Sequence, residues 1–341
     1  MHKKFDNIVV FMPRFIGDCI NCTPALELVK QHYPTAEISL IIQPLASEVF
    51  NREQKVSLIL DDRKKNKVKG TLFLIQQIKN KNFDACILLT NKLADALIAK
   101  ISGINTVVGY DSEFRGSLLT HKTKMDLSRH YINRYAYVAN LLCNNEHKIL
   151  PEVSIFHDVS LSKIAHIKNI KIGFCILGKN KLPRHYPPNL TAKVIKLITQ
   201  NIKNRVPMDA SFFIFGAKDE SPEANEVTSI CNNSGIKTVS PCTGIYTIEE
   251  LIDTIADLDL LITVDSGPLH IAAAVNTATI ALQSKGTSPF SNVCPKGKQV
   301  TVINNAGNYI NDNDQILDIS PKLVSETAIK LLLSNLNHNP Q

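Results

Sequence analysis

The polar residues best placed to do chemistry follow an apolar run in the C-terminal half, where residues 263–274 read TVDSGPLHIAAA. Residues 258–264 are typical of a buried strand, and the small residues after Pro268 are typical of a helix. Ligands of parallel α/β sheets bind where strands end and helices begin, because a helix N-terminus offers free N–H groups and partial positive charge. The segment predicts either an anion cradle or an ordinary helix cap. The candidate residues here are Asp265, Ser266, Gly267 and His270.

A second polar turn follows the next strand-like run, 278–282, and offers Lys285, Thr287 and Ser288. Two polar turns after successive parallel strands lie on the same sheet edge. Together they favour an anionic ligand such as a nucleotide diphosphate.

The N-terminal half has a matching feature, in which the apolar run 8–12 leads into PRFIGD and ends on Asp18. A carboxylate after a glycine, at a loop-to-helix junction, is a candidate general base. The alternative is that Asp18 only caps the helix. The chain has no G-x-G-x-x-G at this turn and no G-x-x-x-x-G-K-[ST] anywhere, which disfavours a dehydrogenase or a P-loop enzyme.

These residues need a scaffold, and strand and helix patterns alternate along the whole chain. The alternation predicts parallel, doubly wound sheets in two Rossmann-like domains with a cleft between them. Expected strands cover 5–12, 36–42, 57–60, 85–89, 106–109, 171–176, 211–215, 258–264 and 278–282. Expected helices cover 19–31, 71–80, 92–101, 130–142, 190–201, 222–231, 247–256, 268–275 and 321–335. The predicted domains are 1–155 and 156–320, followed by a C-terminal helix and tail, 321–341.

Composition limits the class of protein. The 341 residues are 44% hydrophobic and 20% charged, which is a globular composition. No apolar run reaches the roughly 18–20 residues of a membrane span, and the N-terminus does not have the form of a secretion signal, so we expect a cytoplasmic protein. Eight scattered cysteines, including the lone pair Cys19 and Cys22, are interpreted as structural, with no metal site expected.

The net charge of +7 is uneven, since Lys and Arg outnumber Asp and Glu by 21 to 15 in residues 1–155. Much of this excess lies in RKKNKVK, residues 63–69, which is either a solvated loop or part of a surface that meets an anionic partner. Nucleic acid ranks low as that partner, because the sequence contains no recognised nucleic-acid module.

The motifs together resemble the heptosyltransferase family, glycosyltransferase family 9, and most closely its heptosyltransferase II type. The resemblance covers nearly the whole chain in the family's order and spacing. The segments that carry it are RFIGDCINCTPALELVKQHYP, VVGYDSEFRGSLLT, HYINRYAYVANLL, LPRHYP, FGAKDE and DLLITVDSGPLHIAAAVNTATIALQSKGTSP.

The resemblance implies a GT-B fold and a metal-independent, cofactor-free transfer of heptose from ADP-heptose to the lipid A–Kdo inner core of lipopolysaccharide, with inversion. Asp18 would take the proton from the acceptor hydroxyl. The C-terminal domain would hold the donor through Arg184 and the two polar turns, and the basic N-terminal domain would hold the phosphates and carboxylates of the acceptor. The acceptor-binding candidates are Arg14, Arg63, Lys64 and Arg115. The resemblance further implies a monomer in peripheral contact with the cytoplasmic face of the inner membrane.

Three departures from the family pattern leave the donor open. Arg184 stands where lysine is common, Tyr186 replaces the usual tryptophan, and residues 284–287 read SKGT in place of a Tyr-Gly-Pro-Thr-like turn. The alternatives are another nucleotide sugar or acceptor, or a protein that binds a nucleotide or glycan without catalysis.

Overall fold

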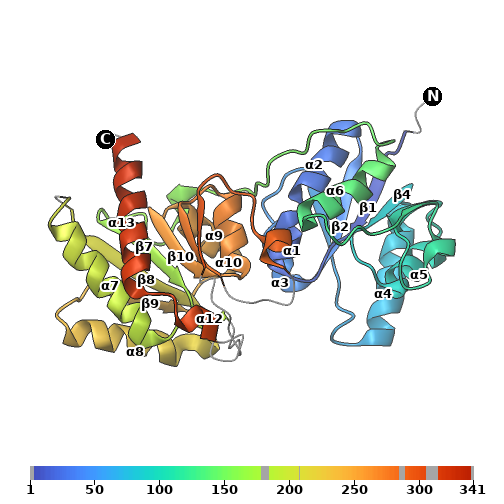
Figure 1. Cartoon of the computed structure of the whole chain (residues 1–341). Helices are drawn as coiled ribbons and strands as arrows, with labels where there is room; N and C mark the ends of the chain where they lie inside the picture. The colour runs from blue at the N-terminus through green and yellow to red at the C-terminus, as the bar shows by residue number, and fades with distance from the viewer. Residues whose placement is uncertain (1–3, 178–183, 207, 284–288, 305–313, 339–341) are drawn as a thin grey trace. The chain divides into compact units, whose positions relative to one another are not determined.

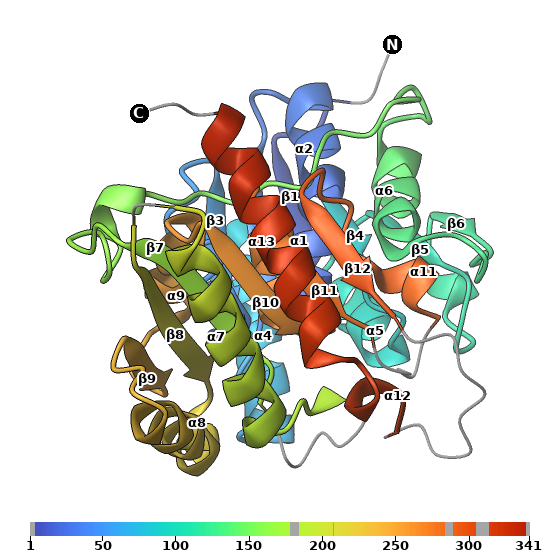
Figure 2. The same ribbon diagram turned by 60° about the vertical axis from the view of Figure 1, so that its left-hand side comes forward.

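The computed structural model describes residues 4–177, 184–206, 208–283, 289–304 and 314–338. The chain divides into two compact units, Met1–Phe156 and His157–Gln341. Each unit is built around its own parallel sheet (Figures 1 and 2). No helix among the described residues is long and apolar enough to cross a membrane.

The first unit contains a six-stranded sheet in the order β3-β2-β1-β4-β5-β6, with every pair parallel. Its strands are β1 (Asn7–Phe11), β2 (Glu37–Ile42), β3 (Val56–Leu60), β4 (Ala85–Leu88), β5 (Thr106–Tyr110) and β6 (His121–Thr123). The central strands β1, β4 and β5 are buried almost throughout, as expected for a sheet that helices cover on both faces.

Helices α2 and α6 pack against each other in the first unit, and α4 contacts α5 (Figure 1). The helical segments are α1 (Ile16–Asn21), α2 (Thr23–His32), α3 (Pro44–Ser47), α4 (Lys67–Lys81), α5 (Leu93–Ile101), the 3-10 turn η1 (Gly116–Leu118) and α6 (Tyr131–Leu142).

The second unit repeats this plan, with a parallel sheet in the order β12-β11-β10-β7-β8-β9. Its strands are β7 (Ile170–Cys175), β8 (Ala210–Gly216), β9 (Val239–Thr243), β10 (Leu260–Val264), β11 (Thr279–Leu282) and β12 (Val300–Ile303). Counted from the first strand of each unit, both sheets have the doubly wound order 3-2-1-4-5-6.

One face of the second sheet is covered by α7 flanked by α8 and α13, and α9 packs against α10 (Figure 2). The helical segments are η2 (Val159–Leu161), α7 (Pro188–Lys203), η4 (Lys218–Glu220), α8 (Ser221–Asn233), α9 (Ile248–Ala256), α10 (Gly267–Ala274), α11 (Phe290–Val293), α12 (Asp314–Leu317) and α13 (Pro321–His338). The largest side chains of this core are Phe174, Phe212 and Tyr186.

The predicted helix 19–31 is two helices, because the chain turns at Cys22. The Cys22 N–H donates to the carbonyls of Asp18 and Cys19 at 3.1 Å each, and Pro24 lies in the first turn of α2, where a missing N–H costs little. Strands β6, β9 and β12 were not predicted. Each lies at or beside a sheet edge, where a strand needs little apolar sequence, and β9 carries Pro241.

The sheet order fixes where a ligand can bind in each unit. The connections after adjacent strands β1 and β4 leave in opposite directions, and those after β7 and β10 do the same. Such switch points open a crevice at the carboxyl ends of the strands. Asp18 follows β1 and Asp265 follows β10, so both candidate sites lie at switch points.

Candidate functional site

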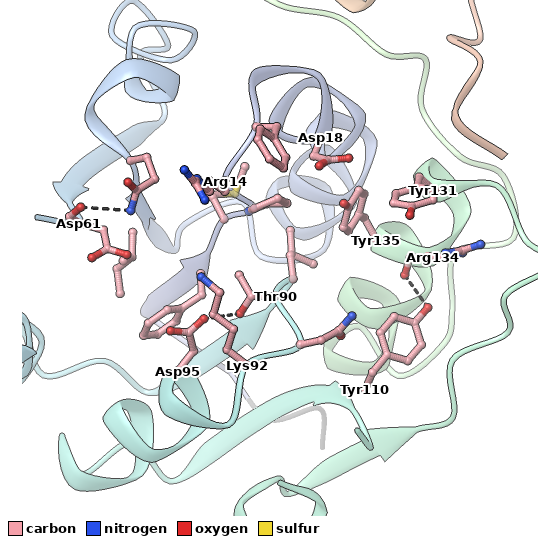
Figure 3. A pocket seen from close by; sticks show the side chains of 18 of the residues that line it. Arg14, Asp18, Asp61, Thr90, Lys92, Asp95, Tyr110, Tyr131, Arg134 and Tyr135 are labelled. Carbon is pink, nitrogen blue, oxygen red and sulfur yellow. Dashed lines mark hydrogen bonds between the residues drawn. The ribbon is translucent and has the colours of Figure 1, made fainter. Parts of the chain in front are cut away.

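A cavity of about 370 Å³ opens at the switch point of the first unit (Figure 3). It is lined chiefly by the segments that follow β1, β3 and β4 and by the N-terminal half of α6. Three predicted residues line it, namely Arg14, Asp18 and Arg63.

Asp18 lies in the first turn of α1, with its side chain partly exposed. The N-cap of α1 is Phe15, whose side chain makes no capping hydrogen bond. Asp18 is therefore not the N-cap residue. In Figure 3 its carboxylate lies on the same side of the cavity as Tyr131 and Tyr135. Burial raises the pKa of Tyr135, and the nearby Cys22 and Asp18 raise it further, so the phenol stays neutral and can donate a hydrogen bond.

Two cations lie exposed at the cavity, Arg14 from the loop after β1 and Lys92 from the loop after β4. The Arg14 guanidinium lies 5.5 Å from the centre of the Phe15 ring, which is itself exposed. These cations can bind an anionic molecule, and the carboxylate of Asp18 can accept a proton from it.

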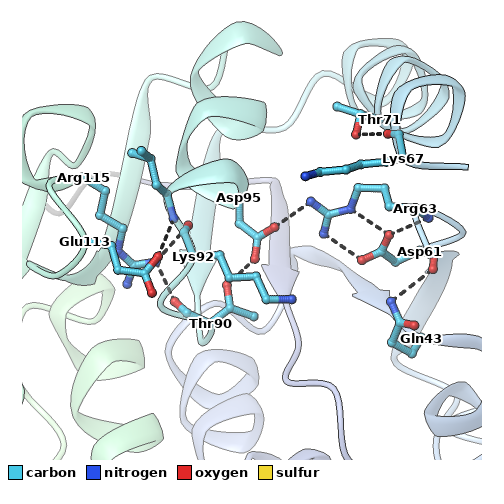
Figure 4. A network of polar contacts seen from close by, with 11 residues as sticks. Gln43, Asp61, Arg63, Lys67, Thr71, Thr90, Lys92, Asp95, Glu113 and Arg115 are labelled. Carbon is cyan, nitrogen blue, oxygen red and sulfur yellow. Dashed lines mark hydrogen bonds and ion pairs between the residues drawn. The ribbon is translucent and has the colours of Figure 1, made fainter.

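Arg63 is held by two carboxylates (Figure 4). Its Nε and Nη2 donate to the two oxygens of Asp61 at 2.8 and 2.7 Å, and its Nη1 donates to Asp95 Oδ1 at 2.7 Å. Thr90 Oγ donates to the other oxygen of Asp95 at 2.5 Å. Burial alone would raise the pKa of Asp61, but the hydrogen bonds and charge of Arg63 lower it. Arg63 thus joins the end of β3 to α5 across the wall of the cavity, and its charge is largely neutralised there.

The structure does not bring Arg115 or Lys64 to the cavity wall. Arg115 has 0% of its surface exposed. Its Nε donates to the Tyr110 carbonyl at 2.8 Å, and its Nη1 donates to the Thr90 carbonyl at 2.6 Å. Burial lowers the pKa of Arg115 despite nearby carboxylates, chiefly Asp95. Arg115 therefore supports the loop that carries Lys92, and Lys64 lies exposed on the loop after β3.

Sequence reasoning missed the contribution of α6. Arg134 is nearly buried, donates to the carbonyls of Arg129 and Leu127, and lies 4.4 Å from the centre of the Tyr131 ring. The Tyr110 hydroxyl donates to the Arg134 carbonyl at 2.9 Å. The HYINRY segment carries Tyr131, Arg134 and Tyr135 at helical spacing, and this spacing is the feature of the sequence that could have indicated their role.

The second unit brings Arg184 and Asp265 together at its own switch point. Arg184 Nη2 lies 3.3 Å from Asp265 Oδ2, and the Asp265 side chain is 10% exposed. Burial raises the pKa of Asp265, while the charge of Arg184 opposes that rise. Arg184 keeps 35% of its side chain exposed, so it can contact an anion while it remains beside Asp265.

Ser266 is the N-cap of α10, and Gly267 is its first residue. The Ser266 hydroxyl donates back to the Val264 carbonyl at 3.2 Å and accepts no capping hydrogen bond from an N–H of the helix. His270 lies one turn in and is nearly buried. Lys285, Thr287 and Ser288 lie outside the described residues. The described part of this site therefore consists of the Arg184–Asp265 pair and the start of α10.

The family model for glycosyltransferase family 9 (heptosyltransferase) matches residues 71–317. The chain belongs to this family of glycosyltransferases. Among curated relatives, lipooligosaccharide heptosyltransferase 2 of Campylobacter jejuni is 26% identical over 310 residues, covering 84% of each chain. Lipopolysaccharide heptosyltransferase 2 of Escherichia coli K12 is 20% identical, over 96% of this chain and 98% of the relative.

Solved structures of the family have the same fold. The structure of E. coli ADP-heptose LPS heptosyltransferase II matches with a TM-score of 0.81 and 21% identity, covering 96% of this chain and 99% of the other. A family 9 glycosyltransferase from Veillonella parvula matches with a TM-score of 0.80, also at 21% identity. The predicted GT-B heptosyltransferase fold, with two Rossmann-like parallel sheets, is therefore confirmed.

Proposed function

We propose that this family 9 member transfers L-glycero-D-manno-heptose from ADP-heptose to the inner core of lipopolysaccharide, with inversion at the anomeric carbon. The observation that carries the proposal is the cavity of the first unit, where the Asp18 carboxylate lies with the exposed cations Arg14 and Lys92. The relatives named above are lipooligosaccharide or lipopolysaccharide heptosyltransferases.

On the acceptor side, Asp18 takes the proton as the acceptor hydroxyl attacks, which converts the hydroxyl into a stronger nucleophile. Arg14 and Lys92 contact the phosphates or carboxylates of the acceptor. Arg63 fixes the shape of the wall through Asp61 and Asp95 and offers less free charge than the sequence suggested.

On the donor side, negative charge develops on the ADP leaving group as the glycosidic bond breaks, and a fixed cation stabilises it. Arg184 supplies that charge. The start of α10 at Ser266 and Gly267 supplies N–H groups, and Asp265 contacts the sugar or orients the loop. His270 supports this loop, and Lys285, Thr287 and Ser288 complete the donor site from the following turn. We place the protein at the cytoplasmic face of the inner membrane as a peripheral monomer.

The test of catalysis is Asp18→Asn, which keeps the size of the side chain and removes its basicity. ADP release in the presence of ADP-heptose and a Kdo–lipid A or heptosylated core acceptor should fall by about 10²–10⁴-fold. Calorimetry should show unchanged binding of ADP-heptose. The control is Asp62→Asn, an exposed carboxylate outside the cavity that should leave turnover unchanged. Normal turnover in Asp18→Asn would exclude Asp18 as the base.

The test of the donor is a calorimetric panel of ADP-heptose, ADP-glucose, UDP-glucose and GDP-mannose on the wild type and on Asp265→Ala. Selective binding of ADP-heptose that Asp265→Ala weakens would support both the donor and its site. Preference for another nucleotide sugar would keep the reaction class and replace the donor. Binding of ADP with no transfer to any acceptor would favour a non-catalytic protein.

A further inference from the structure

Three side chains that can ligate a metal meet at one end of the first unit. His32, Cys143 and His147 each offer a ligand atom, and these atoms all lie within 4.8 Å of one another. His32 is the last residue of α2, and Cys143 caps the C-terminal end of α6. Because α2 packs against α6, residues more than a hundred positions apart come together.

The loop after α6 is folded so that His147 returns to this point. Asn144 and Asn145 both adopt the left-handed conformation, with φ of 54° and 58°, which reverses the chain after Cys143. The side chain of Asn140 then holds the His147 backbone from both sides, since it donates to the His147 carbonyl at 2.8 Å and accepts from its N–H at 3.2 Å. The His147 ring is thus placed by its backbone rather than left on a free loop.

The surroundings of the three side chains favour a state with a bound metal ion over a state without one. His147 Nε2 is buried and has no hydrogen-bond partner among the described atoms, which is a costly state for a ring nitrogen. Cys143 is 0% exposed, and its thiol donates a long hydrogen bond to the Leu28 carbonyl at 4.0 Å. The rings of His32 and His147 meet edge to face, with centroids 5.5 Å apart.

We propose that His32, Cys143 and His147 bind one zinc-type divalent cation. Thiolate and imidazole are the ligands that zinc prefers, and a fourth position can be filled by Glu146 or by water. Glu146 Oε2 lies 3.7 Å from His32 Nδ1, and its side chain is 47% exposed, which gives an ion a path to the site. In a tetrahedral zinc site the ligand atoms lie about 2.0–2.3 Å from the ion and therefore roughly 3.5 Å from one another. Small rotations of the three side chains would bring their ligand atoms to this spacing.

Binding requires the Cys143 thiol to lose its proton. Burial, and then the charge of Glu146, raises the pKa of Cys143 to about 12, so the thiol is protonated at neutral pH until a cation replaces the proton.

The site lies far from the cavity. Tyr131 and Tyr135 line the cavity in the first half of α6, and Cys143 follows the end of this helix, roughly 12–18 Å from them along the axis at 1.5 Å per residue. The ion would join the C-terminal ends of α2 and α6, next to the hydrogen bond from the Tyr33 hydroxyl to the Leu142 carbonyl at 2.7 Å. Its effect is on the stability of the first unit, and it can be tested whether or not the enzyme transfers heptose.

The experiment adds Co²⁺ and then Zn²⁺ to the full-length protein after treatment with a chelator. We expect one Co²⁺ per chain, with thiolate charge-transfer absorption and visible bands of tetrahedral cobalt, and loss of these bands when Zn²⁺ displaces it. Cys143→Ala should abolish the thiolate band. His147→Gln should weaken binding by more than the roughly 10–100-fold that changes around metal ligands cause. The control His121→Gln removes an exposed histidine elsewhere in the unit and should change nothing.

Stability gives a second measurement. Zinc at about 100 times its Kd should raise the midpoint of thermal unfolding of the wild type by roughly 5 °C or more, and should not do so in Cys143→Ala or His147→Gln. Circular dichroism checks that both variants are folded. Absence of the cobalt bands in the wild type, or their persistence in Cys143→Ala, would overturn the proposal.

Discussion

Replacing Arg115 with methionine should destabilise the first unit rather than weaken acceptor binding directly. The fully buried guanidinium donates two short hydrogen bonds, to the carbonyls of Tyr110 and Thr90. Hydrogen bonds from charged groups contribute about 1.5–3 kcal/mol each, so their loss costs about 3–6 kcal/mol. Methionine fills much of the same space and avoids the cost of burying a charge, which reduces the net loss to about 2–4 kcal/mol.

The assay is urea unfolding followed by circular dichroism, because the chain has no tryptophan to report by fluorescence. A matched control is Arg129→Met, since Arg129 is an exposed arginine whose ion pair with Asp126 spans 3.2 Å at the surface. Such surface pairs contribute about 0–1 kcal/mol. Arg115→Lys should fall between wild type and Arg115→Met, because one ammonium cannot reproduce the fork of the guanidinium.

The reasoning would be refuted by a variant that unfolds at the same urea concentration as Arg129→Met and yet has a raised KM for the acceptor. That result would return Arg115 to the set of acceptor ligands predicted from the sequence. If the buried arginine acts through the loop at residues 90–92, loss of stability and loss of kcat should appear together.

Three further predictions concern single side chains. Tyr186→Phe removes the hydroxyl that donates to the Ile319 carbonyl at 2.9 Å and should lower the free energy of unfolding by about 1–2 kcal/mol in urea titrations; an unchanged midpoint would contradict this. The folded-state pKa of Asp61 lies below its ordinary 3.8, so its pairing with Arg63 stabilises the fold above about pH 4 and is lost as the pH falls through the folded pKa. The stability difference between wild type and Asp61→Asn should therefore shrink below pH 4, and a constant difference would argue against the pairing. Gly173→Ala would place a Cβ 2.5 Å from a leucine methyl and should cost about 1–3 kcal/mol, whereas an equally stable variant would show that the core can move aside.

The central strands could be predicted from sequence because both faces of each are buried. Strands β1 (NIVVF) and β10 (LLITV) are almost entirely apolar, and burial on both faces requires such a run. Edge strands carry no such requirement. The residues of β6, HKT, are exposed or partly exposed, and β9 includes proline, so their pairing is determined by neighbours that sequence patterns do not reveal.

The candidate site was predictable where a residue lies in the turn or helix start that follows a central strand, as Asp265 does after β10 and Asp18 does after β1. The role of a charged side chain was not predictable where residues distant in the sequence neutralise its charge. Arg63 lies in a basic run, and nothing local indicates that Asp95, 32 residues away, neutralises it together with Asp61. Arg115 shows the same limit, since its guanidinium donates to the carbonyl of Thr90, 25 residues away, as well as to that of the nearby Tyr110.

Strand β9 is an edge strand of the second sheet, and it carries proline at position 241. The N–H of Phe212 bonds to the Thr238 carbonyl, and the N–H of Gly244 bonds to the Gly216 carbonyl. Even-numbered residues of β9 therefore bond to β8, and odd-numbered residues direct their N–H groups outward. Pro241 removes the donor in the middle of that outward row. A strand from another molecule cannot complete a hydrogen-bonded ladder there, so this border is protected against the sheet-to-sheet growth that leads to aggregation.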